Sequence, residues 1–377
     1  MPLMSSLDET FMSLALELAE AGLGYVEPNP TVGAVIVRDG MELARGWHRA
    51  FGGPHAEVEA ISAAATKGLD TRGAILYVTL EPCCHHGKTP PCTEAVIAAG
   101  IARVVAAMED PDVRVAGRGF AALRAAGIEV TQGVCAPQAR KLLAAYIKLR
   151  ATGRPWVTCK WAQTSDGAIA LPPQAGRWIS SQESRDYVHR LRGWHQGVCV
   201  GIGTVLADDP LLTNRGGTGR QPARIVLDSS LRIPLDCRLV RSAGQSPVIV
   251  ATTSPACDKA DRLRRVGVEI LPLPPLGGKN HDRATGGVDL AALLEELGRR
   301  QFTRLVVEGG AKVLKAFLEA DLADELLVFV CPSPLKTGLA DLPRLDIAEI
   351  EKSLRLSGPQ RRTIGPDTLL RYLLSRP

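Results

Sequence analysis

Aromatic side chains are scarce in this chain of 377 residues, at only 4%. Aliphatic residues and alanine must therefore fill the interior, and a hydrophobic content of 45% is ample for two cores. No apolar run approaches the ~20 residues that cross a membrane. The N-terminus also lacks the charged, apolar and small segments of a secretory signal. We therefore expect a cytoplasmic protein with no membrane partner.

A disulfide framework is not expected either, because nine cysteines are few for a chain of this length. Three of them cluster between positions 83 and 92. The other six are expected to be reduced thiols in the core: Cys135, Cys159, Cys199, Cys237, Cys257 and Cys331. The net charge is +5, but the basic residues are dispersed. We therefore expect no nucleic-acid partner; a phosphorylated small substrate and cofactor would account for the charge equally well.

Two short stretches contain the residues of a catalytic metal site. The first is His55-Ala56-Glu57, and the second has the sequence E-P-C-C-H-H-G-K-T-P-P-C over residues 81–92. One imidazole and two thiolates, from His55, Cys83 and Cys92, can hold zinc tetrahedrally and leave its fourth position for water. Zinc lowers the pKa of that water, and the Glu57 carboxylate can carry its proton without binding the metal.

The pattern is close to that of the zinc nucleobase deaminases, H-x-E followed by P-C-x-x-C. Here eight residues instead of two separate the outer cysteines. Cys84, His85 and His86 are further possible ligands, but a fourth protein ligand would close the site. We therefore expect them to face the substrate or solvent. The alternative is a structural zinc module with four protein ligands, in which Glu57 has no role.

The block from H-A-E to P-P-C resembles the deaminase domain of the bifunctional riboflavin-biosynthesis deaminase/reductase family, known as RibD or RibG. The likeness includes residues 28–33, 110–111 and 115–119 and extends over nearly all of the chain. It implies a cytidine-deaminase-like fold, with Asn29 as a contact for the edge of the pyrimidine. His48 and Lys88 are candidates for binding other polar groups of the substrate, including its phosphate. A deaminase of nucleobases or tRNA with an accessory domain is the rival interpretation.

Alternating strands and helices predict a three-layer α/β domain over residues 1–150. Strands are expected at 32–38, 41–46, 75–79, 103–107 and 128–131, and helices at 55–66, from Cys92 onward, at 117–126 and at 136–149. The segment 150–155 breaks a helix, so a second domain is placed at 154–377. Its expected strands are 156–161, 197–201, 224–228, 305–307, 326–330 and 369–374, with helices at 184–193 and 312–319. The Gly/Pro-rich stretch 272–288 is expected to be an exposed loop.

The second half resembles the dihydrofolate-reductase-like α/β reductase domain of the same family. Its signatures are K-W-A-Q-T-S-D-G over residues 160–167 and T-V-L-A-D-D-P-L-L-T over residues 204–213. Gly201-x-Gly203 is not a Rossmann fingerprint, because Leu206 stands where a small residue is required. Gly309-Gly310 ends a buried strand and precedes a helix, whose free amides can bind a phosphate instead.

The resemblance implies two reactions, zinc-dependent deamination of a phosphoribosylamino-pyrimidine and reduction of its ribosyl group by NADPH. Glu57 is the expected catalytic residue of the first, and Lys160, Asp208 and Glu308 those of the second. The expected cofactor contacts are Ala162, Trp178, Thr204, Asp208, Ser229, Gly309 and Gly310. The expected substrate contacts of the reductase are Gly176, Arg192, Leu212, Arg215 and Glu308. A homo-oligomer is also expected.

Overall fold

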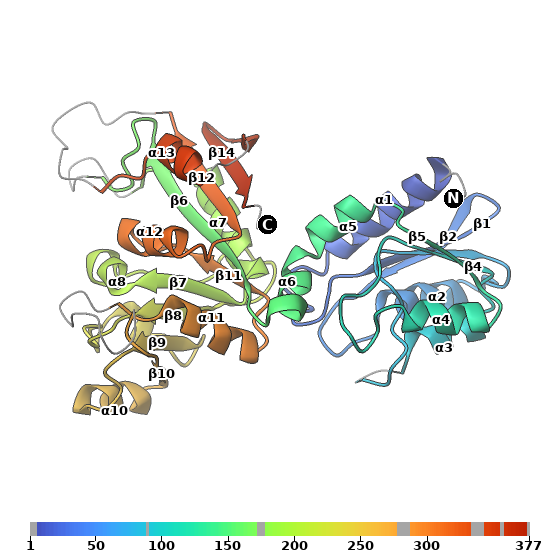
Figure 1. Ribbon diagram of the computed structural model, residues 1–377, viewed down its shortest axis with the longest axis horizontal. Helices are drawn as coiled ribbons and strands as arrows, with labels where there is room; N and C mark the ends of the chain where they lie inside the picture. The colour runs from blue at the N-terminus through green and yellow to red at the C-terminus, as the bar shows by residue number, and fades with distance from the viewer. Residues whose placement is uncertain are drawn as a thin grey trace. The chain divides into compact units, whose positions relative to one another are not determined.

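The computed structural model describes residues 6–87, 90–171, 178–276, 287–332, 343–354 and 358–374. The chain divides into two compact units, Met1–Gly153 and Arg154–Pro377, which the colours of Figure 1 separate as blue to green and green to red. Within the described ranges, no helix is long and apolar enough to cross a membrane.

The first unit contains a five-stranded sheet in the order β2-β1-β3-β4-β5. Strand β1 pairs antiparallel with β2 and β3, whereas β3, β4 and β5 are parallel. Asp39 and Gly40 both have positive φ, so the D-G pair forms the hairpin turn that it predicts. The strands are β1 (Gly33–Arg38), β2 (Met41–Trp47), β3 (Ile75–Val78), β4 (Arg103–Ala106) and β5 (Glu129–Gln132).

Helices cover both faces of this sheet, so the predicted three-layer architecture is confirmed (Figure 1). One face carries α1 (Ser6–Glu20) and α5 (Ala136–Leu142), and the other carries α2 (Ala56–Thr66), α3 (Cys92–Ala98) and α4 (Arg118–Ala125). The single helix expected at 136–149 is wrong. At Leu143 the backbone leaves helical geometry (φ −90°, ψ 5°) and the side chain enters the core, so that α6 (Ala144–Thr152) starts afresh.

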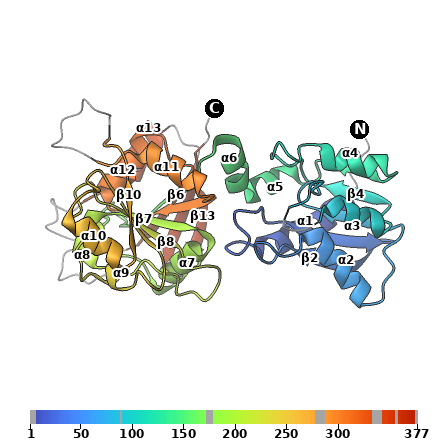
Figure 2. The same cartoon turned by 90° about the horizontal axis from the view of Figure 1, so that it is seen from below.

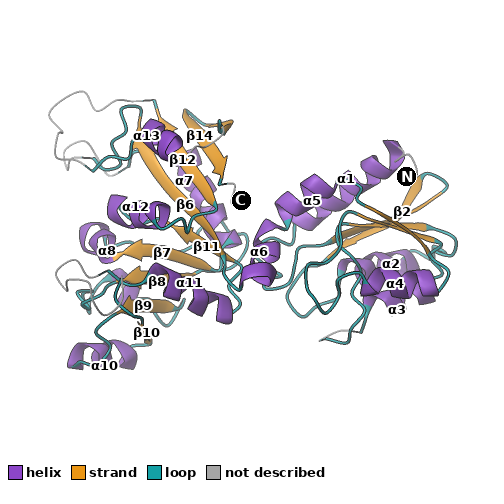
Figure 3. Cartoon of the chain, viewed as in Figure 1, coloured by secondary structure: helices purple, strands orange, loops and turns teal. Residues whose placement is uncertain are grey.

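The second unit is built on a nine-stranded sheet in the order β10-β9-β8-β7-β11-β6-β12-β14-β13. All neighbouring pairs from β10 to β12 are parallel (Figure 3). Strand β14 pairs antiparallel with β12, and β13 pairs antiparallel with β14. The strands are β6 (Trp156–Thr164), β7 (Gly197–Gly201), β8 (Ala223–Leu227), β9 (Val248–Thr252), β10 (Val268–Pro272), β11 (Arg304–Val307), β12 (Glu325–Cys331), β13 (Gln360–Ile364) and β14 (Asp367–Leu373).

Two separate cores lie on the two faces of the nine-stranded sheet. Leu305 and Val307 of β11 belong to one core and Val306 to the other. Burial on both faces explains why the parallel strands are continuous apolar runs in the sequence. The first face carries α11 (Leu290–Arg299), α12 (Ala311–Glu319) and α13 (Ile347–Ser353), and the second carries α7 (Gln182–Trp194), α8 (Ile202–Asp208), α9 (Arg238–Arg241) and α10 (Asp258–Arg265) (Figure 2).

The stretch 272–288, expected to be an exposed loop, is exposed only in part. Pro272 is the last residue of β10, and Pro275 forms an isolated bridge with Val288. Val288 is 5% exposed and belongs to the core beneath α11. The expectation is therefore wrong at this end of the stretch, because one apolar residue is enough to return the chain to the core; residues 277–286 lie outside the described ranges.

The C-terminal end of α7 packs tightly against the loop formed by residues 214–221. Asn214 fixes this loop, since its Nδ2 donates to Thr218 O at 2.5 Å and its Oδ1 accepts from Gly216 N at 2.8 Å. A Cβ atom at Gly193 would lie 2.4 Å from Thr218 O and 2.7 Å from Asn214 Nδ2. Glycine is therefore required at this point of a helix for the loop to approach.

We predict that Gly193→Ala lowers the free energy of unfolding. The added methyl group meets a backbone carbonyl that cannot rotate away, and overpacking of this kind costs about 1–3 kcal/mol. Alanine regains at most ~1 kcal/mol through helix propensity. Urea unfolding of the whole chain measures the difference. Gly244→Ala is the matched control, because a Cβ there meets nothing within 4 Å; equal stability of the two variants would contradict the prediction.

Candidate active sites

Three predicted metal ligands come together in the first unit. His55 is the N-terminal cap of α2, Cys83 follows β3, and Cys92 is the first residue of α3. Their ligand atoms lie within 4.8 Å of one another, with His55 Nδ1 at 3.2 Å from Cys92 Sγ and 3.5 Å from Cys83 Sγ. Tetrahedral zinc with bonds of ~2.0–2.3 Å places its N and S ligands ~3.6 Å apart. The donor set therefore fits zinc in both chemistry and spacing.

The two thiols of this cluster have opposite pKa shifts. A hydrogen bond from the Cys92 thiol, followed by the contact with His55, lowers the pKa of Cys83 to about 4. The same hydrogen bond to Cys83, together with burial, raises the pKa of Cys92. The protein alone therefore stabilises one thiolate at the expense of the other. A divalent cation between the two sulfurs would stabilise both as thiolates.

Glu57 lies in the first turn of α2 and is only 3% exposed. Burial, and next the negative charge of Cys83, raise the pKa of its carboxyl group to about 7. A carboxyl group with a pKa near neutrality can both accept and return a proton. The described part of the chain places three ligands in the cluster, and Cys84 and His85 are not among them. This arrangement favours an open catalytic site over a closed structural one.

Asn29 and His48 lie beside the cluster. The buried His48 ring meets the His55 ring edge-on at 5.1 Å, and its Nδ1 lies 2.8 Å from Pro54 O. A carbonyl oxygen only accepts, so Nδ1 carries the hydrogen and Nε2 accepts from Asn29 Nδ2 at 3.3 Å. This contact fixes the orientation of the Asn29 amide. Lys88, the third expected contact, lies outside the described residues.

The motif also contains a structural residue to which sequence reasoning gave no role. The Glu81 carboxylate is buried and accepts hydrogen bonds from three backbone amides, those of Asp110 (3.2 Å), Gly117 (2.9 Å) and Phe120 (3.1 Å). These bonds tie the first turn of α4 and the segment before it to the loop that carries Cys83. No local sequence pattern indicates this role, because the partners are backbone amides 29 to 39 residues away.

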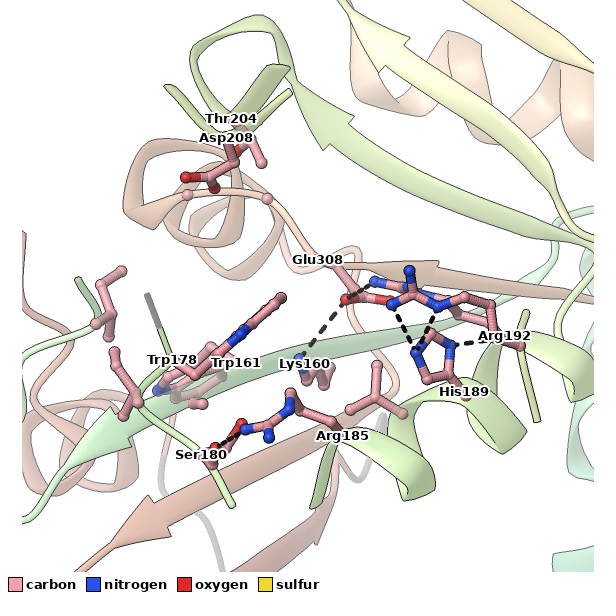
Figure 4. Close-up of a pocket in the computed structure, with 17 residues that line it drawn as sticks. Lys160, Trp161, Trp178, Ser180, Arg185, His189, Arg192, Thr204, Asp208 and Glu308 are labelled. Atoms are coloured by element: carbon pink, nitrogen blue, oxygen red, sulfur yellow. Dashed lines mark hydrogen bonds and ion pairs between the residues drawn. The ribbon is translucent and has the colours of Figure 1, made fainter. Parts of the chain in front are cut away.

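In the second unit, a cavity of about 290 Å³ opens where β6, β7 and β11 end (Figure 4). Most of the predicted reductase residues line it: Lys160, Ala162, Trp178, Arg192, Thr204, Asp208, Arg215, Glu308, Gly309 and Gly310. Thr204 and Asp208 are one helical turn apart on α8 and lie close together in Figure 4. The carboxyl edge of a parallel sheet is the usual ligand site of such folds.

Two predicted residues of the described ranges do not line this cavity, and a third lies outside those ranges. Leu212 is 5% exposed and packs in the core beneath α7, in a left-handed conformation with φ +54°. Ser229 lies in the turn after β8, outside the lining of the cavity, where its carbonyl accepts from the Thr252 hydroxyl. Gly176 lies outside the described residues. The expected roles of these residues stay predictions.

Glu308 is the centre of a buried charge cluster in the cavity. Its carboxylate accepts from Arg192 Nε at 2.7 Å and Nη2 at 3.0 Å, and Lys160 Nζ lies 3.6 Å away (Figure 4). Burial alone would raise the pKa of Glu308, but the charges of Arg192 and Lys160 hold it at about 2. Burial lowers the pKa of Lys160, and Glu308 opposes that effect. The site therefore keeps an ionised carboxylate beside an ammonium group that loses its proton more readily than usual.

One face of α7 lines the cavity, although only Arg192 was expected there. Arg185, Val188 and His189 precede Arg192 at helical spacing and all four reach the cavity. Arg185 also lies over the Trp178 ring, 5.2 Å from its centroid. These residues could have been predicted from the sequence. Once Arg192 is assigned to a site, the residues at positions i−3, i−4 and i−7 lie on the same face of the helix and are expected to reach that site.

The fold and the sites together define a class of protein, a zinc-binding deaminase joined to a reductase. Residues 5–108 match the zinc-binding region of cytidine and deoxycytidylate deaminases. Residues 155–366 match the RibD C-terminal domain. The two matched regions correspond to the two compact units of the chain.

Full-length relatives then identify the family. The riboflavin biosynthesis protein RibD of Aquifex aeolicus is 41% identical over 97% of this chain and 98% of its own length, and that of Escherichia coli is 38% identical over 96% and 98%. The structure of Acinetobacter baumannii RibD matches with a TM-score of 0.82 and 34% identity, covering 98% of this chain and 99% of its own. The chain belongs to the RibD family of riboflavin biosynthesis proteins.

Membership of this family confirms the expected fold class, a cytidine-deaminase-like domain followed by a RibD reductase domain. It confirms a bifunctional deaminase and reductase of riboflavin biosynthesis over a nucleobase or tRNA deaminase with an accessory domain. The cofactors are zinc for the deaminase and NADPH for the reductase. The geometry of the His55, Cys83 and Cys92 cluster agrees with the first of these.

We predict that Cys83→Ser and Cys92→Ser each lose most of the bound zinc, because each removes one thiolate of the cluster. Cys84→Ser should retain zinc, since its sulfur is not in the cluster. Metal analysis of the purified variants measures zinc per chain. Equal zinc loss in all three variants would instead support a closed site with Cys84 as a ligand.

Proposed function

We propose that the first unit removes the 2-amino group of 2,5-diamino-6-(5-phosphoribosylamino)pyrimidin-4(3H)-one. The second unit then reduces the ribosyl side chain of the resulting 5-amino-6-(5-phosphoribosylamino)uracil to ribityl. The main support is the cluster of His55, Cys83 and Cys92 beside a buried Glu57. A structurally similar protein from Thermotoga maritima, 36% identical with a TM-score of 0.82, bears the name of these two activities.

In the deaminase, the residues of this chain orient the pyrimidine and move protons. Zinc would act as the Lewis acid that lowers the pKa of a water molecule. His55, Cys83 and Cys92 would hold the metal ion. A Glu57 carboxylate oxygen would take one proton from the water and give it to the ring nitrogen as oxygen adds to the ring carbon. The same carboxylate would then pass the remaining proton of the added hydroxyl group to the amino group, which leaves as ammonia while the carbonyl forms. The Asn29 amide, fixed by His48, presents its oxygen to an N–H group of the pyrimidine.

In the reductase, Gly309 and Gly310 form the cofactor contact. Gly310 caps α12, and at Gly309 an added Cβ would lie only 2.6 Å from Val313 Cβ, so glycine is required at position 309. A backbone free of side chains before a helix start suits a phosphate of NADPH. NADPH supplies the hydride to C1′ of the sugar. Lys160 Nζ, held by Glu308, gives a proton to the sugar oxygen, and Thr204 and Asp208 line the nicotinamide side.

Arg215 is the residue that we assign to the substrate phosphate. Arg192 was expected to share this role, but its guanidinium already binds Glu308 with two nitrogens and donates to Thr213 O at 3.1 Å. Arg215 reaches the same cavity from the loop after α8 and is exposed to solvent. An arginine fork suits a phosphate because it can donate two parallel hydrogen bonds.

We also propose a cytoplasmic homo-oligomer that does not act on nucleic acid. All nine cysteines are free, which is typical of a reducing compartment. The charge of +5 is spread over the sequence. Both observations agree with an enzyme of small phosphorylated metabolites.

The two activities should be lost separately. Glu57→Gln keeps the size of the side chain but cannot carry the proton, so ammonia release should fall by about 10²–10⁴ while zinc stays bound. This variant should still oxidise NADPH when given the deaminated pyrimidine. Asp208→Asn should release ammonia normally and reduce poorly. Both variants are assayed with both substrates; if either substitution abolishes both reactions, two independent sites are ruled out.

Cofactor choice tests the position of Ser229, which we assign to the 2′-phosphate of NADPH. Ser229→Asp should raise the KM for NADPH by tenfold or more through charge repulsion, with a much smaller change for NADH. Ser230→Ala, in the next and exposed position, is the control and should leave both constants unchanged. If the unaltered protein uses NADH as well as NADPH in steady-state kinetics, the assignment is wrong.

A further inference from the structure

His189 of α7 contacts Arg215 inside the cavity. The Nε2 atom of His189 lies 3.2 Å from Arg215 Nε and 3.0 Å from Arg215 Nη2. Both nitrogens belong to the edge of the guanidinium group. The contact therefore fixes the plane and the direction of a long side chain on an exposed loop.

Elementary hydrogen-bond chemistry determines the state of this histidine. A guanidinium group only donates, so Nε2 must present its lone pair to Arg215. The hydrogen of the neutral ring is then on Nδ1, which donates to Thr213 O at 3.2 Å. The contact between Arg215 N and the same Nδ1, at 3.3 Å, is therefore close packing and not a hydrogen bond. His189 must be neutral with its hydrogen on Nδ1.

The surroundings of His189 favour this neutral form. Burial lowers the pKa of the ring, and the positive charges of Arg192 and Arg215 lower it further; the Thr213 carbonyl and Glu308 oppose these effects. A protonated ring would direct an N–H group at the donors of Arg215. The neutral acceptor is thus the form that suits its neighbours at physiological pH.

Thr213 O joins this contact to the charge cluster at Glu308. It accepts from His189 Nδ1 and from Arg192 Nη1, and Arg192 binds the Glu308 carboxylate. His189 and Arg192 are one turn apart on α7. One face of a rigid helix therefore sets the distance between Arg215 and the residues around the expected reducing centre, Lys160 and Glu308.

We propose that His189 is a positioning residue that directs the Arg215 guanidinium toward the substrate phosphate and so determines the preference of the reductase for a phosphorylated substrate. The proposal rests on the function proposed for Arg215. It predicts that His189 contributes to binding of the phosphate alone, because its ring contacts the arginine and not the reacting carbon.

The test is steady-state reduction of 5-amino-6-(5-phosphoribosylamino)uracil and of the same compound without its phosphate. His189→Ala should raise the KM for the phosphorylated substrate about tenfold, the usual scale for one hydrogen bond to a charged group. The KM for the dephosphorylated compound, the KM for NADPH and kcat should stay within about twofold. His189→Gln keeps an acceptor of similar reach and should restore most of the affinity.

Two further variants separate the possible outcomes. Arg190→Ala alters an exposed residue of α7 outside the cavity and controls for changes in the helix. In the double variant His189→Ala with Arg215→Gln, the increase in KM for the phosphorylated substrate should equal that of Arg215→Gln alone, because His189 acts through Arg215. Additive losses, or an equal loss on both substrates in His189→Ala, would overturn the role of His189 while leaving the phosphate site intact. If Arg215→Gln does not weaken the phosphorylated substrate selectively, both proposals are wrong.

Discussion

Compensation of buried charge is the constraint on which both sites depend. An ionised group removed from water needs an opposite charge or several hydrogen-bond donors. Glu308 forms ion pairs with Arg192 and Lys160, and Glu81 accepts hydrogen bonds from three backbone amides. In the His55, Cys83 and Cys92 cluster, ionisation of both thiols would place two negative charges side by side, and the cation of a zinc site would compensate them. The two buried carboxylates and the thiolate cluster therefore have the same requirement for a compensating group. For Glu308 and Glu81 that group belongs to the chain, whereas for the thiolates it would be a bound metal ion.

The two units bring the residues of their sites together in different ways. In the deaminase unit, the starts of α2 and α3 bring a histidine and a cysteine to a loop after β3. The hydrogen bonds of Glu81 hold that loop in place. In the reductase unit, parallel strands end at one edge of the sheet, and the loops after β6, β7 and β11 converge there. The first arrangement suits a small rigid metal centre. The second leaves a cavity of about 290 Å³ at the edge of the sheet.

Helix α7 has an additional part in the reductase. Its cavity face provides a stacking partner for Trp178, an acceptor for Arg215 and a counter-charge for Glu308, through Arg185, His189 and Arg192 in turn. Near its end, Gly193 lets the loop that carries Arg215 pack closely. Anchoring these contacts on one helix keeps their spacing constant, whereas a site assembled only from loops would depend on each loop separately.

The grouping of His55, Cys83 and Cys92 and much of the cavity lining were predictable from the sequence, because H-A-E, the E-P-C to P-P-C block and the T-V-L-A-D-D-P segment are short motifs. Strands β6, β7, β8, β11, β12 and β14 were predicted from their continuous apolar runs, which burial on both faces of a sheet requires, whereas β9, β10 and β13 were not predicted. The roles of Glu81, His189 and Arg192 were decided by tertiary structure alone. Their partners are backbone amides, a carbonyl oxygen and a carboxylate on other elements, 24 to 116 residues away in the chain. No local pattern specifies such a partner, since only the packing of the elements decides which polar groups meet.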